Sequence, residues 1–402
     1  MEDSGSGSGL LREEHPGKEE DGGMALQYFD ESHNILRQSV RKFVEREILP
    51  YVEEWEEKEE FPRTLYKKAA EAGFLGLGYP EELGGTPADV FHVVAFTEEI
   101  LRCGSVGLVA GLGSQGIALP PILAMGTQEQ KQRFIPPVIA GEKIAALAIT
   151  EPDAGSDVAN IRTRAVRDGD VYVVNGAKTF ITSGCRADVL TVAVRTGGEG
   201  YRGVSLLVVE TSTPGFHVAK KIRKMGWHAS DTGELVFQDC RVPRANLLGE
   251  EGMGFYGIME NFQRERLSLA VMAHQVAQIA YEESLKYAQT RQAFGKPLTG
   301  FQVTRHKLVD MATKIAVARE FNYRVAARMQ AGENVVTEVS MAKNFACEVC
   351  DRVVYDAVQI HGGYGYAREY LVERLYRDSR ILSIGGGTTE IMKEILSKTL
   401  KI

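Results

Sequence analysis

The hydrophobic periodicity changes twice along this chain, and these changes constrain the fold more than any other feature. Apolar residues recur every three or four positions through residues 27–142 and again through residues 251–402, as in amphipathic helices. Between them, in residues 143–250, short apolar stretches alternate with turn residues, as in β-strands. Three C-terminal helical runs span about 25 residues or more, which is typical of a four-helix bundle. The sequence therefore predicts an α+β chain in which a helical domain, a β domain and a helical bundle follow one another.

Individual elements follow from the same patterns. In the C-terminal part we expect helices at residues 253–290, 300–331, 335–360, 367–377 and 388–400. In the N-terminal part a first helix ends at Pro50, and further helices are expected at residues 64–74, 87–103, 107–126 and 128–140. In the β domain the pair Asn175 and Gly176 predicts a hairpin turn. Residues 1–26 are rich in Gly, Ser and Glu, so we expect a disordered tail or an added leader, with the natural start at Met24.

Charge and cysteine content exclude several classes of protein. The net charge of -7 disfavours nucleic acid or an anionic membrane as the main partner. No run of about 18 apolar residues is present, so no membrane span is expected. The five cysteines are scattered and odd in number, which indicates a reducing compartment. The N-terminal residues are acidic and do not resemble a mitochondrial transit peptide.

Three motifs look like cofactor or metal sites but have a simpler structural explanation. Residues 111–116, GLGSQG, have the spacing of a dinucleotide-binding loop, but no βαβ pattern surrounds them, so close packing of a helix explains them better. Cys347 and Cys350 form a lone C-x-x-C pair in a helical run, which predicts buried thiols and not a zinc site. His361 stands in a glycine turn and is interpreted as a turn or interface residue. No metal site is expected.

Polar and glycine-rich segments are better candidates for a functional site. Residues 146–160, ALAITEPDAGSDVAN, and 179–184, TFITSG, suit a planar ligand or an anion, or simply cap the next segment. Residues 290–302, TRQAFGKPLTGFQ, suit a pyrophosphate or a solvated helix end. Residues 383–394, SIGGGTTEIMKE, lead from a glycine loop into a helix start, which suits an anion or a close backbone approach. Glu265, between two arginines, would by itself be a solvated surface group.

Together these segments resemble the acyl-CoA dehydrogenase family over residues 27–402. The resemblance rests on blocks in a fixed order: AITEPDAGSD, KTFITSG, KMGWHASDTGELVFQDCRVP, TRQAFGKPL, AVQIHGGYGY and GGGTTEIMKE. It implies an N-terminal α-helical domain at residues 27–142, a middle, barrel-like β domain at 143–250 and a C-terminal four-helix bundle at 251–402. It also implies that FAD is bound without a Rossmann unit and that an acyl-CoA thioester is dehydrogenated to the trans-2-enoyl-CoA.

The resemblance implies FAD contacts in several segments, and it implies that subunits share them. Contacts along the flavin and at its ring are expected from Leu147, Ile149, Thr150, Gly155, Ser156, Phe180, Ile181 and Thr182. Contacts to the pyrophosphate and adenosine are expected from Arg291, Phe294, Gln302, Gln359, Gly362, Gly363, Thr388, Thr389 and Glu390, in part across subunits. Such sharing implies a homo-oligomer, in this family usually a tetramer. Electrons would then pass to electron-transfer flavoprotein.

The general base is where the chain departs from most of the family. Most members carry this carboxylate in the loop before the last helix, where this chain has Gly386. The long-chain and isovaleryl members carry it instead in a Glu-Arg pair on a bundle helix, which corresponds here to Glu265 and Arg266. The resemblance is closest to the long-chain type, so it implies that Glu265 removes the α-proton while flavin N5 accepts the β-hydride. Contacts to the acyl-CoA are expected from Ser156, Tyr256, Gln263, Arg266, Gly386 and Gly387.

The expected substrate is a long-chain or methyl-branched acyl-CoA, such as citronellyl-CoA. Gly386 is expected to leave space beside the reacting carbons, and a series of small residues is expected to line or back a deep acyl pocket: Gly107, Ala110, Gly111, Gly113, Ser114 and Gly116. Two alternatives remain, an acyl-CoA oxidase-type flavoenzyme and a catalytically inactive homologue that binds acyl-CoA and FAD. The expected location is the cytoplasm of a bacterium or the mitochondrial matrix of a eukaryote.

Overall fold

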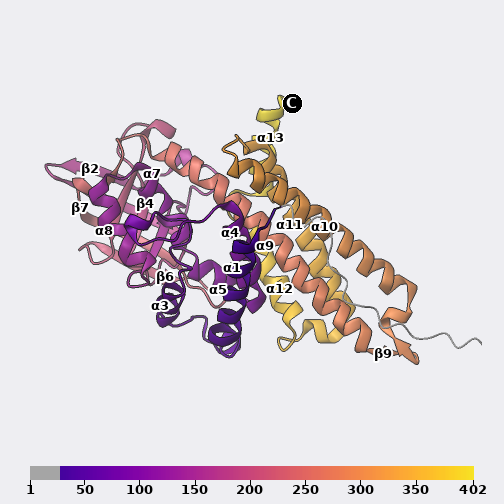
Figure 1. The fold of residues 1–402 in the computed structure, drawn as a ribbon. Helices are drawn as coiled ribbons and strands as arrows, with labels where there is room; N and C mark the ends of the chain where they lie inside the picture. Colours follow the sequence, from indigo (N-terminus) through magenta and orange to yellow (C-terminus); the bar gives the residue numbers. More distant parts are fainter. Residues whose placement is uncertain (1–27) are drawn as a thin grey trace, which may run out of the picture.

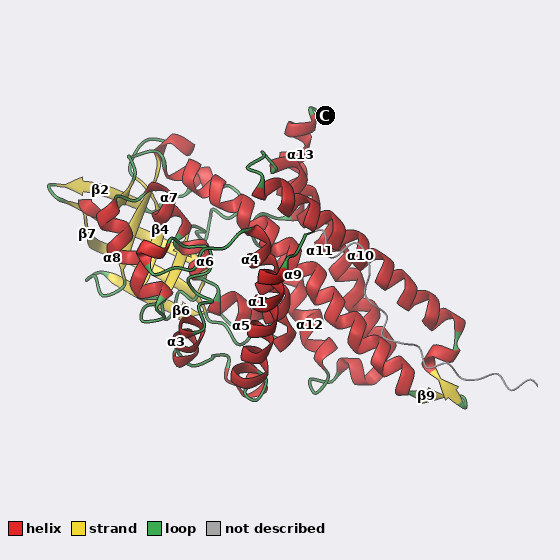
Figure 2. Ribbon diagram, in the orientation of Figure 1, coloured by secondary structure: helices red, strands yellow, loops and turns green. Residues whose placement is uncertain are grey.

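The computed structural model of the protein describes residues 28–402, so the expectations for residues 1–26 lie outside the described residues. Helices occupy both ends of the chain and strands its middle, which confirms the predicted α+β order (Figure 1). Figure 2 shows the strands of the large sheet in one half of the molecule and the long helices in the other, with the short strand β9 at the far end of the helical half. Among the described helices, none is by itself long and apolar enough to cross a membrane; the bent pair Val106–Leu112 and Gln115–Met125 meets that test by length and composition alone.

The N-terminal part is a set of short helices. Its elements are α1 (Glu31–Phe43), which continues as a π-helical turn to Ile48, α2 (Val52–Lys58), α3 (Thr64–Glu71), α4 (Val90–Ile100), α5 (Val106–Leu112), α6 (Gln115–Ala118), α7 (Pro120–Met125) and α8 (Gln128–Ile139). The single helix predicted over residues 107–126 is wrong. The chain bends at Gly113 and Ser114, and Pro120 starts α7 because a proline without an N–H fits the first turn of a helix.

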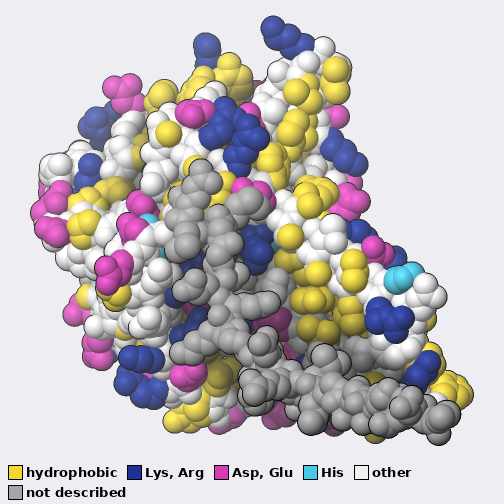
Figure 3. Space-filling model, turned by 45° about the vertical axis from the view of Figure 1, so that its right-hand side comes forward, with side chains coloured by type: hydrophobic (Ala, Val, Ile, Leu, Met, Phe, Trp, Pro, Cys, Tyr) yellow, Lys and Arg dark blue, Asp and Glu magenta, His cyan; other side chains and the backbone are white. Residues whose placement is uncertain are grey.

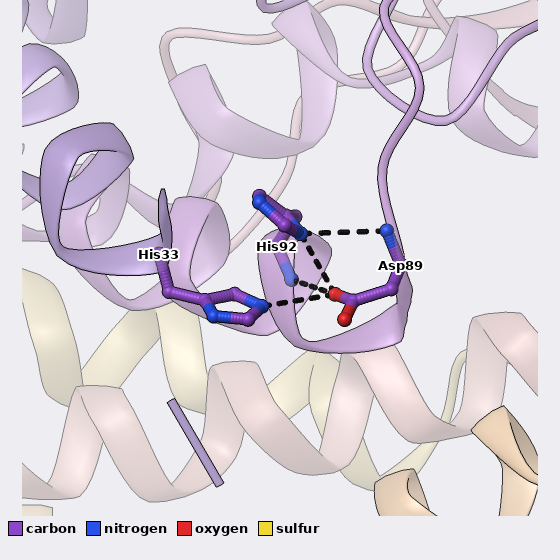
Figure 4. A group of neighbouring side chains, drawn as sticks. All are labelled: His33, Asp89 and His92. Atoms are coloured by element: carbon purple, nitrogen blue, oxygen red, sulfur yellow. Dashed lines mark hydrogen bonds and ion pairs between the residues drawn. The ribbon is translucent and has the colours of Figure 1, made fainter. Parts of the chain in front are cut away.

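Matching capping boxes lock the start of α1 to the start of α4. Asp30 and Asp89 are the N-caps. A ring nitrogen of His33 accepts from the backbone N–H of Asp30, and a ring nitrogen of His92 accepts from that of Asp89. Because His33 Nδ1 accepts from the Asp30 N–H at 3.0 Å, its Nε2 carries the proton and donates to Asp89 Oδ1 at 3.0 Å (Figure 4). The three labelled side chains are close enough to hold a metal ion, but these hydrogen bonds and two positive helix ends disfavour a cation there.

The middle of the chain forms one sheet in the order β6-β7-β3-β2-β4-β5-β8, with β1 parallel to β4. The strands are β1 (Ala145–Ala148), β2 (Arg164–Asp168), β3 (Val171–Thr182), β4 (Val189–Arg195), β5 (Val204–Glu210), β6 (Phe216–Lys221), β7 (Thr232–Pro243) and β8 (Leu247–Leu248). The end strands β6 and β8 are not paired with each other in this described sheet, so the barrel-like domain stays open. Helices α7 and α8 pack on the sheet through Ile122, Phe134 and Ile135, which share a core with Val189 and Leu206.

The hairpin predicted at Asn175 and Gly176 is wrong, because β3 runs straight through this pair. β3 pairs with β7 on both sides of it, and a register shift marks a β-bulge. A Cβ on Gly176 would lie 2.6 Å from the Cα of Thr163, so the glycine permits a close approach of two backbones. The turn between β2 and β3 lies instead at Gly169, whose φ is 61°.

The C-terminal part is a helical bundle built on α9 (Gly254–Thr290), a helix of 37 residues. Helices α10 (Gln302–Gln330) and α11 (Val336–His361) pack along it, and α12 (Leu371–Ser379) and α13 (Thr389–Leu400) complete the bundle. A short hairpin of β9 (Gln292–Ala293) and β10 (Lys296–Pro297) connects α9 to α10. The long helices start and end within a few residues of the predicted positions, because an apolar repeat over many turns defines them well.

One buried aspartate joins the three parts of the molecule. Asp378 of α12 accepts hydrogen bonds from the N–H of Val106, at the start of α5 (3.2 Å), and from the N–H of Trp227, in the connection between β6 and β7 (2.6 Å). A Cβ on Gly107 would lie 2.4 Å from the Cα of Trp227, so α5 and this connection meet backbone to backbone. The junction thereby fixes the sheet relative to the bundle.

Candidate active site

Glu265, on α9, ends in a carboxylate with a buried oxygen. Its Oε2 is inaccessible to solvent and has no hydrogen-bond partner among the described residues, although the residue as a whole is only half-buried. Burial raises the pKa of Glu265 to about 7, and the positive charges of Arg266 and Lys343 act in the opposite direction. An unpartnered carboxylate with a pKa near neutrality is suited to accept a proton.

The glycine loop before α13 lies against this carboxylate. Arg266 Nε donates to the Gly386 carbonyl at 3.2 Å, and Lys343 Nζ donates to the Gly387 carbonyl at 2.6 Å. Cations from α9 and α11 therefore hold two successive carbonyls of the loop. The start of α13 follows at once, with Thr388 as the N-cap, then Thr389 and Glu390.

Gly386 does not leave the open space predicted beside the reacting carbons. Its φ of 64° lies in the region that favours glycine. A Cβ at this position would lie 2.6 Å from Leu269 Cδ1 and 3.5 Å from Glu265 Oε1. Leu269 and the Glu265 carboxylate therefore occupy the volume into which a side chain at position 386 would project.

The segments expected to lie along the flavin meet beyond the ends of β1 and β3. Leu147 lies in β1, and Ile149, Thr150, Gly155 and Ser156 follow it, while Phe180, Ile181 and Thr182 end β3. The Thr179 N–H donates to the Thr150 carbonyl at 2.8 Å, so the two segments lie side by side. Phe180 has a φ of 58° and is 66% exposed, which means that a strained backbone presents a bare aromatic ring.

Apart from Thr388, Thr389 and Glu390, which lie beside the glycine loop, the other expected cofactor residues lie at the far end of the bundle. Arg291 follows α9, and its separation from Glu265 is 26 residues (291 − 265), or roughly 40 Å of helix. The Arg291 guanidinium lies over the ring of Tyr364, 5.6 Å from its centroid, and Phe294 nearby is 95% exposed. This end also contains Gln302 at the start of α10 and Gln359, Gly362 and Gly363 at the end of α11. One chain alone does not bring this group to Glu265.

Two of the residues expected to contact acyl-CoA lie on α9 before Glu265. Gln263 lines a hollow of about 300 Å³ between α9 and the turn that joins α10 to α11. Tyr256 is 48% exposed and packs edge to face on Tyr201, with 6.0 Å between ring centroids. The Arg202 guanidinium lies 5.8 Å from the centroid of the Tyr201 ring. Sequence reasoning missed Tyr201 and Arg202, because they meet Tyr256 only in the folded chain.

The small residues expected to line the acyl pocket mostly serve close packing. The Cβ that Gly107 lacks would collide with Trp227, and one on Gly111 would lie 2.9 Å from Phe61 Cε1. Gly116, in contrast, has no atom within 4 Å of a Cβ placed on it. Ser114 is buried as well, whereas Ala110, Gly113 and Gly116 remain accessible. Gly107 and Gly111 therefore do not line an open pocket, and a role of these residues and of Ser114 behind the acyl cavity stays a prediction.

The simpler interpretations of the first two motifs are confirmed, whereas an interface role of His361 stays a prediction. Residues 111–116 lie on α5 and α6 and not in a βαβ unit. Cys347 and Cys350 are free, buried thiols of α11, and burial raises the pKa of Cys347 to about 12. His361 is buried at the end of α11, where its Nδ1 lies 2.8 Å from the Ala357 carbonyl oxygen.

Comparison with known proteins identifies the family. Models of the acyl-CoA dehydrogenase N-terminal, middle and C-terminal domains match residues 30–142, 146–240 and 252–401, respectively. The chain belongs to the acyl-CoA dehydrogenase family. An acyl-CoA dehydrogenase of Bacillus subtilis is 42% identical, over 91% of this chain and 97% of that protein. The rat mitochondrial long-chain specific acyl-CoA dehydrogenase is 40% identical, over 92% of this chain and 87% of that protein.

Solved structures agree with this assignment. A probable acyl-CoA dehydrogenase of Mycobacterium abscessus has a TM-score of 0.92 and 54% identity, and the match covers 93% of this chain and all of that one. An acyl-CoA dehydrogenase of Bacillus anthracis complexed with FAD has a TM-score of 0.89 and 34% identity, over 94% of this chain and 69% of that chain. The protein is therefore an FAD-dependent acyl-CoA dehydrogenase. Another acyl-CoA dehydrogenase relative, the CarC subunit of a caffeyl-CoA reductase–Etf complex of Acetobacterium woodii, is 39% identical over 93% of this chain and 99% of that protein.

Proposed function

We propose that this acyl-CoA dehydrogenase oxidises a long-chain or methyl-branched acyl-CoA to the trans-2-enoyl-CoA, with Glu265 as the general base. The observation that carries the proposal is the buried, unpartnered Oε2 of Glu265 beside Gly386. A base needs a free lone pair and a pKa near the working pH, and Glu265 has both. No other carboxylate is available in the loop of residues 383–389.

The glycine loop provides donors for the charge that forms when the α-proton leaves. The N–H groups of Gly386 and Gly387 donate to no group among the described residues, while Arg266 and Lys343 hold their carbonyls. A thioester oxygen bound to such N–H groups would be stabilised as enolate charge develops on it. The loop and Glu265 then act on the same substrate carbons.

FAD supplies the acceptor for the β-hydride. We place its ring against Phe180 and Thr182, because an exposed aromatic on a strained backbone at a strand end suits a planar ligand. We place its pyrophosphate and adenosine at Arg291 and Gly362 of a second subunit, because these lie roughly 40 Å from Glu265 in one chain. Gly362 has no atom within 4 Å of a Cβ placed on it, so a ligand can approach its backbone closely.

A homo-oligomer follows from this division of the FAD site, and we propose a tetramer because that state is usual in the family. The bundle carries large apolar side chains in contact with solvent, including Val303 (72% exposed) and Val309 (62%) on α10 and Tyr355 (49%) on α11. Figure 3 shows hydrophobic side chains gathered over the bundle side of the molecule. Such a surface is typical of a subunit interface. Electron-transfer flavoprotein is the proposed electron acceptor, in line with the Etf complex of the Acetobacterium relative.

The substrate proposal rests on the relatives and on the hollow beside Gln263, because Gly386 supplies no open space. The long-chain enzyme of rat is a relative across almost the whole chain. Gln263 precedes Glu265 on α9, and the exposed pair Tyr201 and Tyr256 lies further toward the start of that helix. Tyr256 and Gln263 share one face of α9, and we propose that the CoA moiety contacts this face and that the substrate passes around the helix to bring its thioester to Glu265. The proposed location is a bacterial cytoplasm or a mitochondrial matrix, because the relatives include a protein of Bacillus subtilis and a mitochondrial protein of rat.

Replacing the base tests the proposal. Glu265→Gln removes the proton acceptor without changing the size of the side chain, so flavin reduction by an acyl-CoA should slow by at least about a thousandfold. FAD should remain bound, as measured by the visible absorption of the purified protein. A variant that bleaches at the wild-type rate in anaerobic stopped flow would show that Glu265 is not the base.

A panel of substrates separates the alternatives. Anaerobic bleaching by short, long and branched acyl-CoAs distinguishes an active enzyme from an inactive homologue, which would show none. Reoxidation in air, with and without electron-transfer flavoprotein, distinguishes a dehydrogenase from an oxidase. We expect bleaching by long or branched chains and slow reoxidation by oxygen.

A further inference from the structure

Lys178 is a fully buried lysine in the sheet. It stands in β3 on the same side as the buried residues Tyr172 and Val174. An unpaired charge at such a place costs several kcal/mol, so partners must hold it. Burial lowers the pKa of Lys178 to about 8 against the opposing effect of Glu151, so the lysine is mostly protonated at neutral pH.

Both partners of Lys178 belong to the segment that follows β1. Its Nζ donates to the Ile149 carbonyl and to Glu151 Oε1, each at 2.8 Å. The Glu151 carboxylate also accepts from the N–H of Arg162 at 2.5 Å and from that of Thr163 at 2.9 Å. The buried carboxylate therefore closes the whole loop between residues 151 and 163, and Lys178 ties this loop to β3.

The strained end of β3 begins two residues after Lys178. Phe180 and Ser183 have φ values of 58° and 59°, which are rare for residues with a side chain. Such a backbone persists only where its surroundings fix it. The contacts that directly precede it are those of Lys178 and the hydrogen bond from Thr179 to Thr150. Lys178 and the hydrogen bond from Thr179 thus join segment 149–156 to the part of β3 that leads into residues 180–182.

Stability alone does not account for an ion pair at this place. A buried ion pair commonly stabilises a fold no more than an apolar pair of the same volume. β3 is already paired with β2 on one side and β7 on the other. The ammonium group of Lys178 instead fixes the relative orientation of the two segments, because it must donate to a carbonyl and a carboxylate at the same time.

We propose that Lys178 is a positioning residue of the FAD site. The buried pair of Lys178 and Glu151 fixes segments 149–156 and 180–182 in the relative geometry that holds the flavin ring. Lys178 acts through the backbone of these segments and does not touch the reacting atoms. This inference rests on the placement of the flavin proposed above.

Two variants separate positioning from stability. Lys178→Met leaves Glu151 buried without its cation, so we expect a lower melting temperature. The double variant Glu151→Gln and Lys178→Met removes both charges and should regain most of that loss. Both should bind FAD at least about tenfold more weakly than the wild type, with a visible spectrum shifted toward that of free FAD. Lys178→Arg, which keeps the charge, should restore part of the affinity.

The matched control is Glu98→Gln, a buried carboxylate of α4 bonded to His274 and Tyr323. It should lower the melting temperature and leave the flavin spectrum unchanged. A double variant with both wild-type stability and wild-type FAD affinity would overturn the role of Lys178. Thr182→Val tests the underlying placement. If Thr182→Val binds FAD normally, the proposed placement of the flavin ring is wrong. If Thr182→Val binds FAD weakly while Lys178→Met binds it normally, the placement stands and only the role of Lys178 is wrong.

Discussion

Glu265 is subject to two opposing influences. Burial disfavours its charged form and raises its pKa to about 7, while Arg266 and Lys343 favour the charged form. The same two cations hold the carbonyls of Gly386 and Gly387. The groups that position the loop therefore also influence the proton affinity of Glu265, the proposed base.

The pH dependence of the reaction follows from this balance. Because Glu265 must be unprotonated, kcat/KM should rise with pH through about 7 and then level off. Arg266→Gln removes one favourable charge, so the pKa of Glu265 should rise and the inflection should move upward by roughly one pH unit. Flavin reduction measured between about pH 6 and pH 9 checks this.

Arg319→Gln, on the exposed side of α10, is the control and should keep the wild-type inflection. If Arg266→Gln keeps it as well, electrostatic tuning of Glu265 by its neighbour is excluded.

The role of a residue could be predicted where a sequence pattern indicates it, but not where it depends on a neighbour that only the fold brings close. Glu265 was assigned as the base through the Glu-Arg pair of the family resemblance, because periodicity alone favoured a solvated group, and this role stays a prediction. Lys343 and Lys178 were missed, although each stands at a position of the buried stripe: Lys343 between Val339 and Ala346, Lys178 in phase with Val174. A lysine in an apolar stripe signals a buried partner, but the partner itself is known only from the fold.

At the scale of elements, glycine was the residue most often misread. Gly176 lies in a continuous strand opposite a bulge of β7, where its missing Cβ permits the close approach of Thr163. Gly107 and Gly111 were assigned to a pocket but meet Trp227 and Phe61. Both errors have one cause. The sequence shows that a Cβ is absent, but it does not show which atoms occupy the space that the Cβ would fill. Long helices were predicted well because their repeat is redundant over many turns.

A pair of glycine substitutions tests the packing role of α5. A Cβ on Gly107 would lie 2.4 Å from backbone of Trp227, which cannot move without disturbing the junction, so Gly107→Ala should cost about 1–3 kcal/mol of unfolding free energy. Gly116→Ala meets no atom within 4 Å and should be neutral or slightly stabilising. Thermal or urea unfolding measures both.

The preference for acyl chain length should not change in Gly107→Ala, as judged by relative bleaching rates across the substrate panel. A shortened chain preference without loss of stability would restore the original assignment of Gly107 to the acyl pocket.

At the scale of the whole molecule, the order of the three parts was predictable and their junction was not. Each part has its own periodicity, so the chain order could be read directly. Asp378 is separated from Val106 by 272 positions and from Trp227 by 151, and no local pattern links them. Asp231 lies in the same connection as Trp227, and its carbonyl accepts a hydrogen bond from the N–H of Ser183, next to the proposed flavin contacts. The junction therefore links the sheet side of the site to the helix that leads into the glycine loop.

The junction contains a second buried acid. Glu56 of α2 accepts from Ser105 Oγ, and its Oε2 is buried without a partner among the described residues. Burial, followed by the charge of Glu56, raises the pKa of Asp378 well above its ordinary value. In the unfolded chain Asp378 would lose its proton near pH 4. Between that pH and its raised pKa the folded protein holds one more proton than the unfolded chain, so stability falls as pH rises through this window.

Glu56→Gln should reduce this pH dependence. The amide removes the repulsion on Asp378, so the pKa of Asp378 falls and less stability is lost between about pH 5 and pH 8. The variant should therefore gain melting temperature relative to the wild type at about pH 8 and gain less at about pH 5. Glu265, whose pKa is raised as well, contributes the same slope to both proteins and cancels in the difference. Glu57→Gln, on the exposed side of α2, is the matched control and should follow the wild type at both pH values. Parallel melting curves of Glu56→Gln and the wild type across this range would mean that the two acids of the junction do not share a proton-dependent repulsion.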